Sequence, residues 1–557
     1  MGRQVYHSDP PGRIGITIKN LCLFRAGSVK NTMNCDRLSH LQQILVTAAQ
    51  MQEIEAQILA AGMPVAALME KVAGLISRRI MALYPLQVVK AVGILVGSGH
   101  NGGDALVVAR ELHFQGYQVH IYTAFTKHKE LTNQHLQYAE NLGISISSEI
   151  QSILTSDLII DGLFGFNLSR EITGDIAIAI QQANQSGKSI VSIDIPSGIH
   201  PDTGEVLGVA IKATHTLCLG LWKLGLLQDQ AVEYLGNLEL IDFDIPLANI
   251  ELVLNKSPRI MRFTSALGLA SIPISKPLVT HKYQQGNLLL ICGSQRYAGA
   301  AVLAGLGARA SGVGMLSIAV PESLKTLLLY HLPEALIIGC PETSTGAISN
   351  LSTLGENWQN HYSAIACGCG LSLEGGDILP AILEVNCPLL LDADGLNLLA
   401  QMGTNAILTQ RHSPTVLTPH WGEFKRLFPE IAQSKDRLQA LQQAAIASQS
   451  IVLLKGARTA IASGLPSNIT APDIRVAIIP ESTPALARGG SGDVLTGLIA
   501  GLVAQNPDPA SLLTTVSSGA WWHAQAGIWA AASRTDLGVD ALTLTKSIIP
   551  ALQEIQS

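Results

Sequence analysis

Gly489-Gly490-Ser491-Gly492-Asp493 stands directly before an apolar run from Val494 to Val503. Small residues followed by such a run predict a tight turn that opens a helix, and the amides and dipole of that helix start can hold a phosphate. Asp493 does not suit a passive anion site, because a carboxylate repels phosphate oxygens. It indicates a base that takes a proton from a hydroxyl group attacking a phosphoryl group. A simpler interpretation stays open, in which Asp493 is an ordinary residue of a glycine-rich helix start.

Length and composition set the broad class. A chain of 557 residues suits two to four domains, and 47% hydrophobic with 14% charged residues is a globular composition with ample core. The net charge of −6, without a block of Lys or Arg, argues against nucleic-acid or anionic-membrane partners. No segment reads as a transmembrane helix. The eight cysteines form no CxxC pair, so we expect reduced thiols in a cytoplasmic protein.

Ordered structure is expected to begin near Val46, because the first forty-odd residues lack periodicity and a clear signal-peptide pattern. We therefore expect residues 1–44 to form a disordered extension, and an over-long start before Met33 is the open alternative. Thr47 and Gln50 have the spacing of a helix capping box. Apolar runs then alternate with helix-length segments, which predicts a parallel, doubly wound sheet with strands at residues 91–96, 118–123, 157–161, 189–194 and 214–219.

Four prolines within residues 244–277 break this alternation, so residues 246–276 are expected to link two domains. A second series of strands and helices follows it. Its expected strands are residues 287–291, 314–320, 388–392, 415–417 and 451–454, followed by helices after Asp493 and near residues 521–532. No fixed-period repeat relates the halves. The sequence thus predicts two different α/β domains, at residues 45–245 and 277–557.

Polar groups gather at the ends of the N-terminal strands, where ligands bind in open α/β sheets. A glycine-rich loop, Gly97 to Asp104, lies between a strand and a helix, although it lacks the GxGxxG spacing. Three later strand ends supply Asp161, the loop from Gly165 to Arg170, and Asp194-Ile195-Pro196-Ser197-Gly198. Asn101, Asp161 and Ser197 offer hard oxygen ligands for a cation, and Asp194 is a candidate acid or base. Each of these residues taken singly could instead be a helix cap.

Similar groups follow the C-terminal strands. Lys455-Gly456-Ala457-Arg458-Thr459 offers cationic and hydroxyl contacts for a nucleotide. His420 ends another strand, and Asp392 and Asp394 could hold Mg²⁺ through water. Capping remains the simpler interpretation of His420 and Asp392. Close approach of the backbone to a ligand is expected at Gly293-Ser294, Tyr297-Ala298-Gly299-Ala300 and Gly368-Cys369-Gly370.

With these motifs, residues 45–245 resemble the YjeF-type N-terminal domain, the NAD(P)H-hydrate epimerase. The resemblance rests on Gly97–Asp104, Asp161-Gly162-Leu163-Phe164-Gly165 and Asp194–Gly198. It implies potassium held by Asn101, Asp161 and Ser197. It also implies that the hydrate contacts Asn101, Gly102, Gly103, Asp104, Gly165, Phe166, Asn167, Leu168, Ser169, Arg170 and Asp194, with Asp194 catalytic. His100 and Ala105 depart from the family pattern, where Asn and Gly are usual.

Residues 277–557 resemble the ribokinase-like YjeF C-terminal domain, the ADP-dependent NAD(P)H-hydrate dehydratase. The resemblance implies hydrate contacts from Ala300, Gly370, His420 and Asp493, with Asp493 catalytic. It implies nucleotide contacts from Lys455, Gly456, Ala457, Arg458, Thr459 and Gly492, and Cys369 replaces the usual proline of a GPG turn. ADP as co-substrate rests on the resemblance to the prokaryotic-type enzymes.

Together the two resemblances imply a bifunctional repair enzyme for nicotinamide nucleotides. The N-terminal domain would interconvert the R and S hydrates of NAD(P)H, and the C-terminal domain would dehydrate the S form with ADP, giving AMP and phosphate. Potassium, Mg²⁺ and small-molecule substrates are expected, with no nucleic-acid or membrane partner, in a homo-oligomer. Two alternatives stay open: a ribokinase-like kinase for a vitamin precursor, and a non-catalytic binding role for the N-terminal domain.

Overall fold

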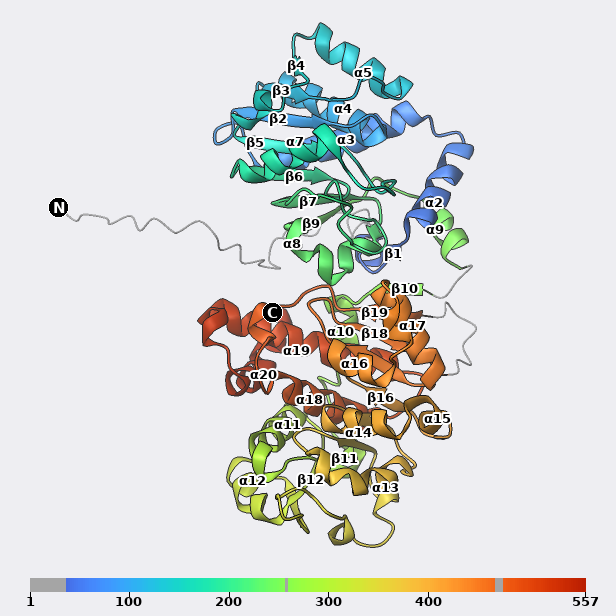
Figure 1. The fold of residues 1–557 in the computed structure, drawn as a ribbon, viewed down its shortest axis with the longest axis vertical. Coiled ribbons are helices and arrows are strands. Elements are labelled where there is room, and N and C mark those ends of the chain that lie inside the picture. Colours follow the sequence, from blue (N-terminus) through green and yellow to red (C-terminus); the bar gives the residue numbers. More distant parts are fainter. Residues whose placement is uncertain (1–36, 256–258, 466–473, 557) are drawn as a thin grey trace, which may run out of the picture.

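The computed structural model describes residues 37–255, 259–465 and 474–556, which form two α/β domains stacked along the long axis of the molecule (Figure 1). The predicted extension lies outside the described residues up to residue 36. Its last residues, 37–44, are instead packed onto the protein. Arg37 forms an ion pair of 2.7 Å with Asp242, and the side chain of Leu41 is fully buried.

The N-terminal sheet has seven parallel strands in the order β4-β3-β2-β5-β6-β7-β9. The five predicted strands are confirmed, and two short or polar ones were missed. The strands are β2 (Ala91–Val96), β3 (Gln118–Tyr122), β4 (Ser145–Ser147), β5 (Leu158–Gly162), β6 (Ser189–Ile193), β7 (His215–Leu219) and β9 (Asn237–Ile241). Strand order reverses between β2 and β5, so the loops after these strands border the crevice where doubly wound sheets bind ligands.

Both faces of this sheet are covered, which explains why its strands are continuously apolar. Ile160 of β5 packs in the core beneath α3 (Val65–Leu83) and α4 (His100–Phe114), whereas the adjacent Ile159 packs with α6 (Gln151–Leu154) and α7 (Gly174–Gln185) on the other face. Helix α5 (Glu130–Asn141) lies against α4. Helix α2 (Ala48–Ala60) begins with the predicted capping box, in which Thr47 Oγ1 accepts from Gln50 N at 3.2 Å.

The C-terminal sheet has ten strands in the order β10-β19-β18-β17-β16-β15-β14-β11-β12-β13, and only β18 runs antiparallel to its neighbours. All five predicted strands are present in it. The strands are β10 (Arg259–Arg262), β11 (Asn287–Ile291), β12 (Met315–Pro321), β13 (Leu336–Cys340), β14 (Ala364–Cys367), β15 (Leu389–Leu391), β16 (Thr415–Leu417), β17 (Ile451–Leu454), β18 (Ala460–Ser463) and β19 (Ile474–Ile478).

Helices again cover both faces. One core is formed with α11 (Ala298–Ala310), α18 (Ser491–Gln505), α19 (Leu512–Arg534) and α20 (Ala541–Gln556). The opposite core is formed with α13 (Leu379–Leu383), α14 (Asp394–Met402), α15 (Thr404–Leu408), α16 (Trp421–Leu427) and α17 (Arg437–Ser448). The two helices predicted in this region correspond to α18 and α19. The six cysteines within the described residues are buried and free.

Residues 246–276, expected as a linker, carry structure that belongs to both domains. Helix α9 (Leu247–Leu254) contacts α2, strand β10 forms the edge of the ten-stranded sheet, and α10 (Ser265–Ser271) packs on α19. The strand β1 (Leu45–Val46) pairs in parallel with β8 (Trp222–Lys223), and the preceding Ile44 bridges to Met261 of β10. The exact domain limits remain a prediction.

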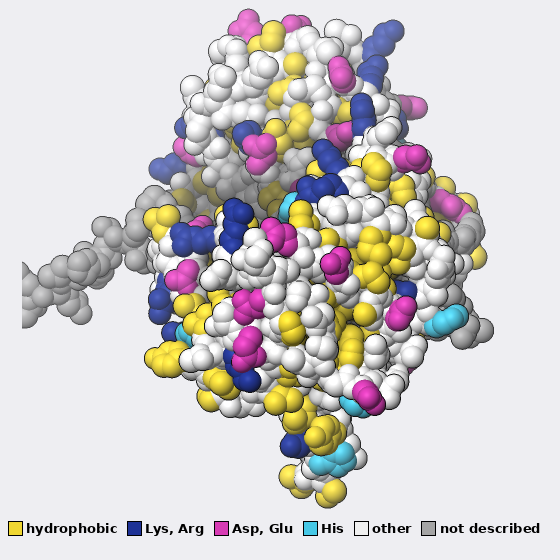
Figure 2. All heavy atoms as spheres, turned by 60° about the horizontal axis from the view of Figure 1, so that its bottom comes forward, with side chains coloured by type: hydrophobic (Ala, Val, Ile, Leu, Met, Phe, Trp, Pro, Cys, Tyr) yellow, Lys and Arg dark blue, Asp and Glu magenta, His cyan; other side chains and the backbone are white. Residues whose placement is uncertain are grey.

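The surface carries charges of both signs. Figure 2 shows Lys and Arg side chains interspersed with Asp and Glu on one face of the molecule. In the three described ranges, no helix combines the length and the hydropathy needed to cross a bilayer.

Candidate active sites

A pocket of about 380 Å³ opens at the switch point of the N-terminal sheet. Nine of the residues that the sequence predicted to contact substrate line it: Asn101, Asp104, Gly165, Phe166, Asn167, Leu168, Ser169, Arg170 and Asp194. Four other predicted residues are buried beside the pocket and do not line it: Gly102, Gly103, Asp161 and Ser197. A side chain at Gly102 would collide with the carbonyl oxygen of Gly97, so its glycine permits close packing of the loop onto the helix start.

Asp194 forms a buried ion pair with Lys223, a residue that the sequence analysis missed. The carboxylate accepts from Lys223 Nζ and from the backbone amides of Leu219 at 3.3 Å and Phe166 at 3.2 Å. Asp194 itself has φ of +69°, a left-handed conformation that costs a non-glycine residue about 1–3 kcal/mol. Burial acts to lower the pKa of Lys223, but the charge of Asp194 outweighs it and the pKa is raised. The lysine therefore stays protonated and neutralises one carboxylate of the pocket.

Two further carboxylic acids share this pocket. Burial raises the pKa of Glu55 to about 7, with Lys223 opposing the shift and Asp194 adding to it. Burial also raises the pKa of Asp104 well above its usual value, and the charges of Asp194 and Glu55 contribute. Burial and the neighbouring charges thus favour the protonated forms of Glu55 and Asp104 beside the Asp194–Lys223 pair, an arrangement suited to proton transfer. Glu55 was not predicted, because it lies on α2, outside the loops that follow the strands.

The expected potassium ligands form a network of oxygen atoms. Ser197 Oγ donates to Asp161 Oδ1 at 2.6 Å and lies 3.3 Å from the carbonyl oxygen of Phe164. Asp161 Oδ2 accepts from Ser192 Oγ at 2.8 Å. Burial raises the pKa of Asp161, and the hydrogen bonds from Ser197 oppose the shift. Carboxylate, hydroxyl and carbonyl oxygens are the donor types that hard cations prefer, so this set fits a potassium ion.

Asn101, the third residue of the expected ligand set, lies at the start of α4 and lines the pocket. A methyl group placed on Gly165 would lie 3.4 Å from Asn101 Oδ1 and 3.2 Å from Asp194 Oδ2, so both side chains face Gly165. Asn101 Nδ2 is buried and has no hydrogen-bond partner among the described residues. This orphaned donor indicates that the pocket receives a ligand with an acceptor group.

In the C-terminal domain, the glycine-rich stretch forms the start of α18 as predicted. Gly490 is the N-cap with φ of +88°, a conformation that favours glycine, and Asp493 stands in the first turn. Burial and the charge of Asp392 raise the pKa of Asp493 to about 6, while a hydrogen bond from Cys369 opposes the shift. A carboxylate with this pKa is mostly ionised at neutral pH and can still accept a proton.

His523 of α19 supports this helix start and was not predicted. Its Nε2 lies 3.0 Å from the carbonyl oxygen of Ser491 and 3.3 Å from Ser491 Oγ. Burial lowers the pKa of His523 to about 4, so the ring is neutral and can donate to the carbonyl oxygen.

Lys455 and Asp392 are brought together from two strands that are not adjacent. Lys455 Nζ lies 2.6 Å from Asp392 Oδ1, and Thr496 Oγ1 of α18 donates to Asp392 Oδ2 at 2.6 Å. Each carboxylate oxygen thus has one protein donor and retains a lone pair for a water molecule. This arrangement fits Mg²⁺ bound through water molecules, because both oxygens of the Asp392 carboxylate already accept a hydrogen bond from the protein. Thr496 of α18 was missed.

Of the residues predicted to contact substrate, Ala300 and Gly370 lie side by side, and His420 caps a helix. A methyl group on Gly370 would lie 2.7 Å from Ala300 Cβ, so these residues adjoin. His420 is the N-cap of α16, and its Nδ1 accepts from Gly422 N at 2.9 Å. The capping interpretation of His420 is thus confirmed; the residue is exposed, and its Nε2 lies 3.6 Å from Glu423 Oε1. Its contact with substrate stays a prediction.

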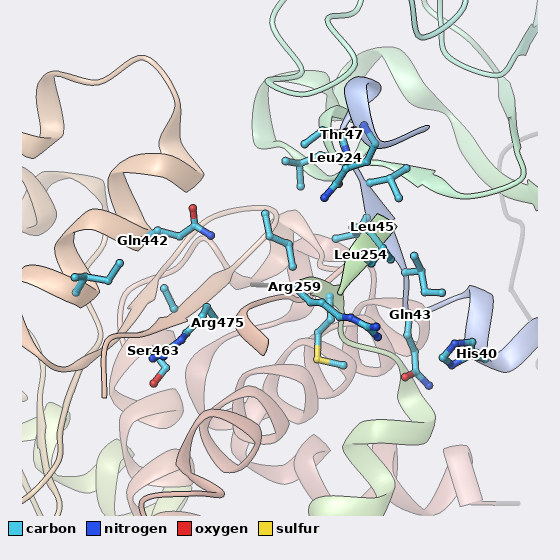
Figure 3. Close-up of a pocket in the computed structure, with 17 residues that line it drawn as sticks. His40, Gln43, Leu45, Thr47, Leu224, Leu254, Arg259, Gln442, Ser463 and Arg475 are labelled. Carbon is cyan, nitrogen blue, oxygen red and sulfur yellow. Dashed lines mark hydrogen bonds between the residues drawn. The ribbon is translucent and has the colours of Figure 1, made fainter. Parts of the chain in front are cut away.

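The cavity of about 440 Å³ between the domains is a different feature (Figure 3). Its walls are formed by β1, β10, α17 and β18, and it includes Thr47, Leu224, Arg259 and Gln442. None of the predicted catalytic or binding residues lines it. It therefore does not belong to either candidate active site.

The chain thus has two α/β domains, each with a candidate active site: the buried Asp194 follows β6 in the first, and the partly buried Asp493 stands in the first turn of α18 in the second. The sequence model described as YjeF-related protein N-terminus matches residues 65–225, and that described as NAD(P)H-hydrate dehydratase matches residues 288–550. The chain is 52% identical to the bifunctional NAD(P)H-hydrate repair enzyme Nnr of Synechocystis sp., over 92% of this chain and 95% of the relative. It is 48% identical to the enzyme of the same name from Thermosynechococcus vestitus, over 91% of this chain and 97% of that one.

The chain belongs to the family of bifunctional NAD(P)H-hydrate repair enzymes, which confirms the resemblance stated from its motifs. It is an enzyme with epimerase and dehydratase activities, and the alternative of a vitamin-precursor kinase on a non-catalytic module is not favoured. The C-terminal part is also similar to an ADP/ATP-dependent NAD(P)H-hydrate dehydratase from Bacillus subtilis, with 29% identity, a TM-score of 0.44, and coverage of 53% of this chain and 98% of that one.

Proposed function

We propose that Asp493 is the catalytic base of the dehydratase reaction. It takes the proton from the hydroxyl group at C6 of the S hydrate, and that oxygen attacks the β-phosphorus of ADP. The bond between the α- and β-phosphates breaks and AMP leaves. Support comes from one observation above all: Asp493 has a pKa of about 6 and stands in the first turn of α18, beside the amides of residues 489–492.

The phosphorylated hydrate then loses phosphate, a far better leaving group than hydroxide. The lone pair of the ring nitrogen drives the breaking of the C6–O bond, and loss of a proton from C5 restores the dihydronicotinamide. Ala300, Gly370 and His420 hold the hydrate in this proposal. Lys455 to Thr459 and Gly492 hold the nucleotide. Mg²⁺, when bound, neutralises phosphate charge, and Asp392 holds it through water.

For the epimerase reaction, Asp194 moves the proton, and Lys223 forms an ion pair with its carboxylate. Residues 101–104 and 165–170 bind the hydrate, with Phe166 and Leu168 forming the apolar wall. Asn101, Asp161 and Ser197 would hold potassium through their oxygen atoms, and the ion would help to fix the substrate. The oxygen network around Asp161 supports this placement.

The remaining expectations concern the protein's setting. We propose a cytoplasmic homo-oligomer whose partners are small molecules and which uses neither nucleic acid nor a membrane. The mixed surface charge and the net charge of −6 support the absence of polyanionic partners.

One assay tests both reactions. Purified protein and ADP are added to a mixture of R and S hydrates, and the absorbance of reduced nicotinamide is followed. Complete recovery is expected. Recovery of only the S fraction would refute the epimerase role, and no recovery with either ADP or ATP would refute the proposal. Replacing K⁺ by Na⁺ should slow R-hydrate use and leave pure S hydrate unaffected.

A further inference from the structure

The N-terminal domain contacts the predicted nucleotide loop of the C-terminal domain through Asp229. This residue begins a short turn, η3 (Asp229–Ala231), six residues after Lys223 in sequence. Asp229 Oδ1 accepts from the backbone N–H of Arg458 at 2.6 Å. It also lies 3.2 Å from Arg437 Nη1, so one carboxylate oxygen holds both the loop and the arginine beneath it.

Arg437, on α17, binds the same loop through its carbonyl oxygens. Its guanidinium donates to the carbonyl of Arg458 at 3.1 Å and to those of Leu454 and Lys455, both at 3.3 Å. Burial lowers the pKa of Arg437, and the charge of Asp229 opposes the shift. Asp229 is therefore the counter-ion of a largely buried arginine that binds three carbonyl groups of the loop.

The loop is also shaped to receive the Asp229 carboxylate. A methyl group at Gly456 would collide with Asp229 Oδ2 and with Arg437 Nη2, so this glycine allows both side chains to reach the backbone. Arg458 Nε is buried and has no hydrogen-bond partner in the described part of the chain. Asp229 fixes the backbone of Arg458, and the side-chain Nε–H of Arg458 stays available to donate to a ligand.

Asp229 is held in place by the fold of the epimerase site. Residues 224–228, which connect it to Lys223, are all buried. The amide of Gly225 donates to the carbonyl of Pro201 at 2.6 Å, which fixes this segment to the loop after β6. The carboxylate that holds the nucleotide loop is thus attached rigidly to the segment that carries the lysine of the other site.

We propose that Asp229 is a positioning residue for the dehydratase reaction: the epimerase domain holds the loop from Lys455 to Thr459 in the conformation that binds the adenine nucleotide. This inference rests on the proposed function, in which that loop binds ADP. If removal of the carboxylate leaves the loop competent in about a tenth of the molecules, the apparent affinity for ADP falls about tenfold.

The test uses the full-length chain with pure S hydrate, so that epimerase activity does not enter. Asp229→Ala should raise the KM for ADP about tenfold, with kcat at saturating ADP within about twofold of wild type. Calorimetric titration with ADP should show the same loss of affinity. Asp229→Asn, which keeps an acceptor for Arg458 N–H but loses the charge, should give a smaller rise of about threefold. The matched control is Glu233→Gln, because Glu233 pairs at 3.2 Å with Lys212 on the surface and should leave the KM unchanged.

Wild-type KM and affinity for ADP in Asp229→Ala would overturn the inference, as would a fall in kcat with the KM unchanged. If Asp229→Ala shows no cooperative thermal unfolding, Asp229→Asn decides by the same two measurements. Failure of the wild-type protein to bind ADP at all would overturn the proposed function and this inference with it. The two failures are therefore distinguishable.

Discussion

Lys455 Nζ lies 2.6 Å from Asp392 Oδ1, although the strands before these residues, β17 and β15, are separated in the sheet by β16. The lysine expected to bind nucleotide phosphates is thus already paired with an acid. Both charges act on Asp493, because Asp392 raises its pKa and Lys455 lowers it. Burial has the largest effect on the pKa of the proposed base, and the two charges of the ion pair adjust it in opposite directions.

Removal of either partner should shift the pH profile of the dehydratase in opposite directions. Lys455→Met removes a charge that lowers the pKa of Asp493, so the midpoint of kcat against pH should rise by about one unit. Asp392→Asn removes a charge that raises this pKa, so the midpoint should fall by a similar amount. Rates of S-hydrate dehydration at saturating ADP, measured across pH, give both midpoints. Shifts in the same direction would contradict the assignment.

Asp493→Asn should lower the kcat of the dehydratase by about 100- to 10,000-fold, because an amide cannot act as the general base. The base must be ionised, so wild-type activity should rise with pH through about 6, the pKa of Asp493. The variant should lose this dependence, and epimerase activity, followed by chromatography of the two hydrates, should persist. Asp508→Asn, in the exposed loop after α18, serves as the control. If Asp493→Asn dehydrates the S hydrate at the wild-type rate, Asp493 is not the catalytic base.

Lys223→Met should destabilise the protein by about 3–5 kcal/mol, because it leaves Asp194 buried without its counter-ion. The double variant Lys223→Met with Asp194→Asn removes both charges, so it should recover much of the stability without epimerase activity. Denaturant unfolding gives the free energies, and R-hydrate consumption gives the activity. Equal stability of the single and double variants would show that the two charges do not interact.

His523 predicts a specific loss of stability in acid. Its pKa is about 4 in the folded protein against 6.5 for an unperturbed histidine, so the unfolded chain binds the extra proton between these values. The free energy of unfolding should therefore fall by about 3 kcal/mol as the pH drops from about 6.5 to about 4. Above about pH 6.5, His523 should cause no change of this free energy with pH. His523→Gln keeps a donor for the carbonyl of Ser491 and cannot titrate. The difference between wild type and variant, measured by denaturant unfolding at each pH, isolates this contribution, and a difference independent of pH would rule it out.

The sequence by itself determined the two α/β domains, because apolar runs of strand length alternated with helix-length segments in both halves. It also located Asp493 and Asp194, since glycine-rich turns and carboxylates at strand ends leave local signals. Only the tertiary structure decided their partners. Lys223, Glu55, His523 and Asp229 lie on other elements, and no local spacing connects a side chain to a charge that folding brings beside it. Burial and pairing set the ionisation of these groups, and both depend on contacts between residues far apart in the chain.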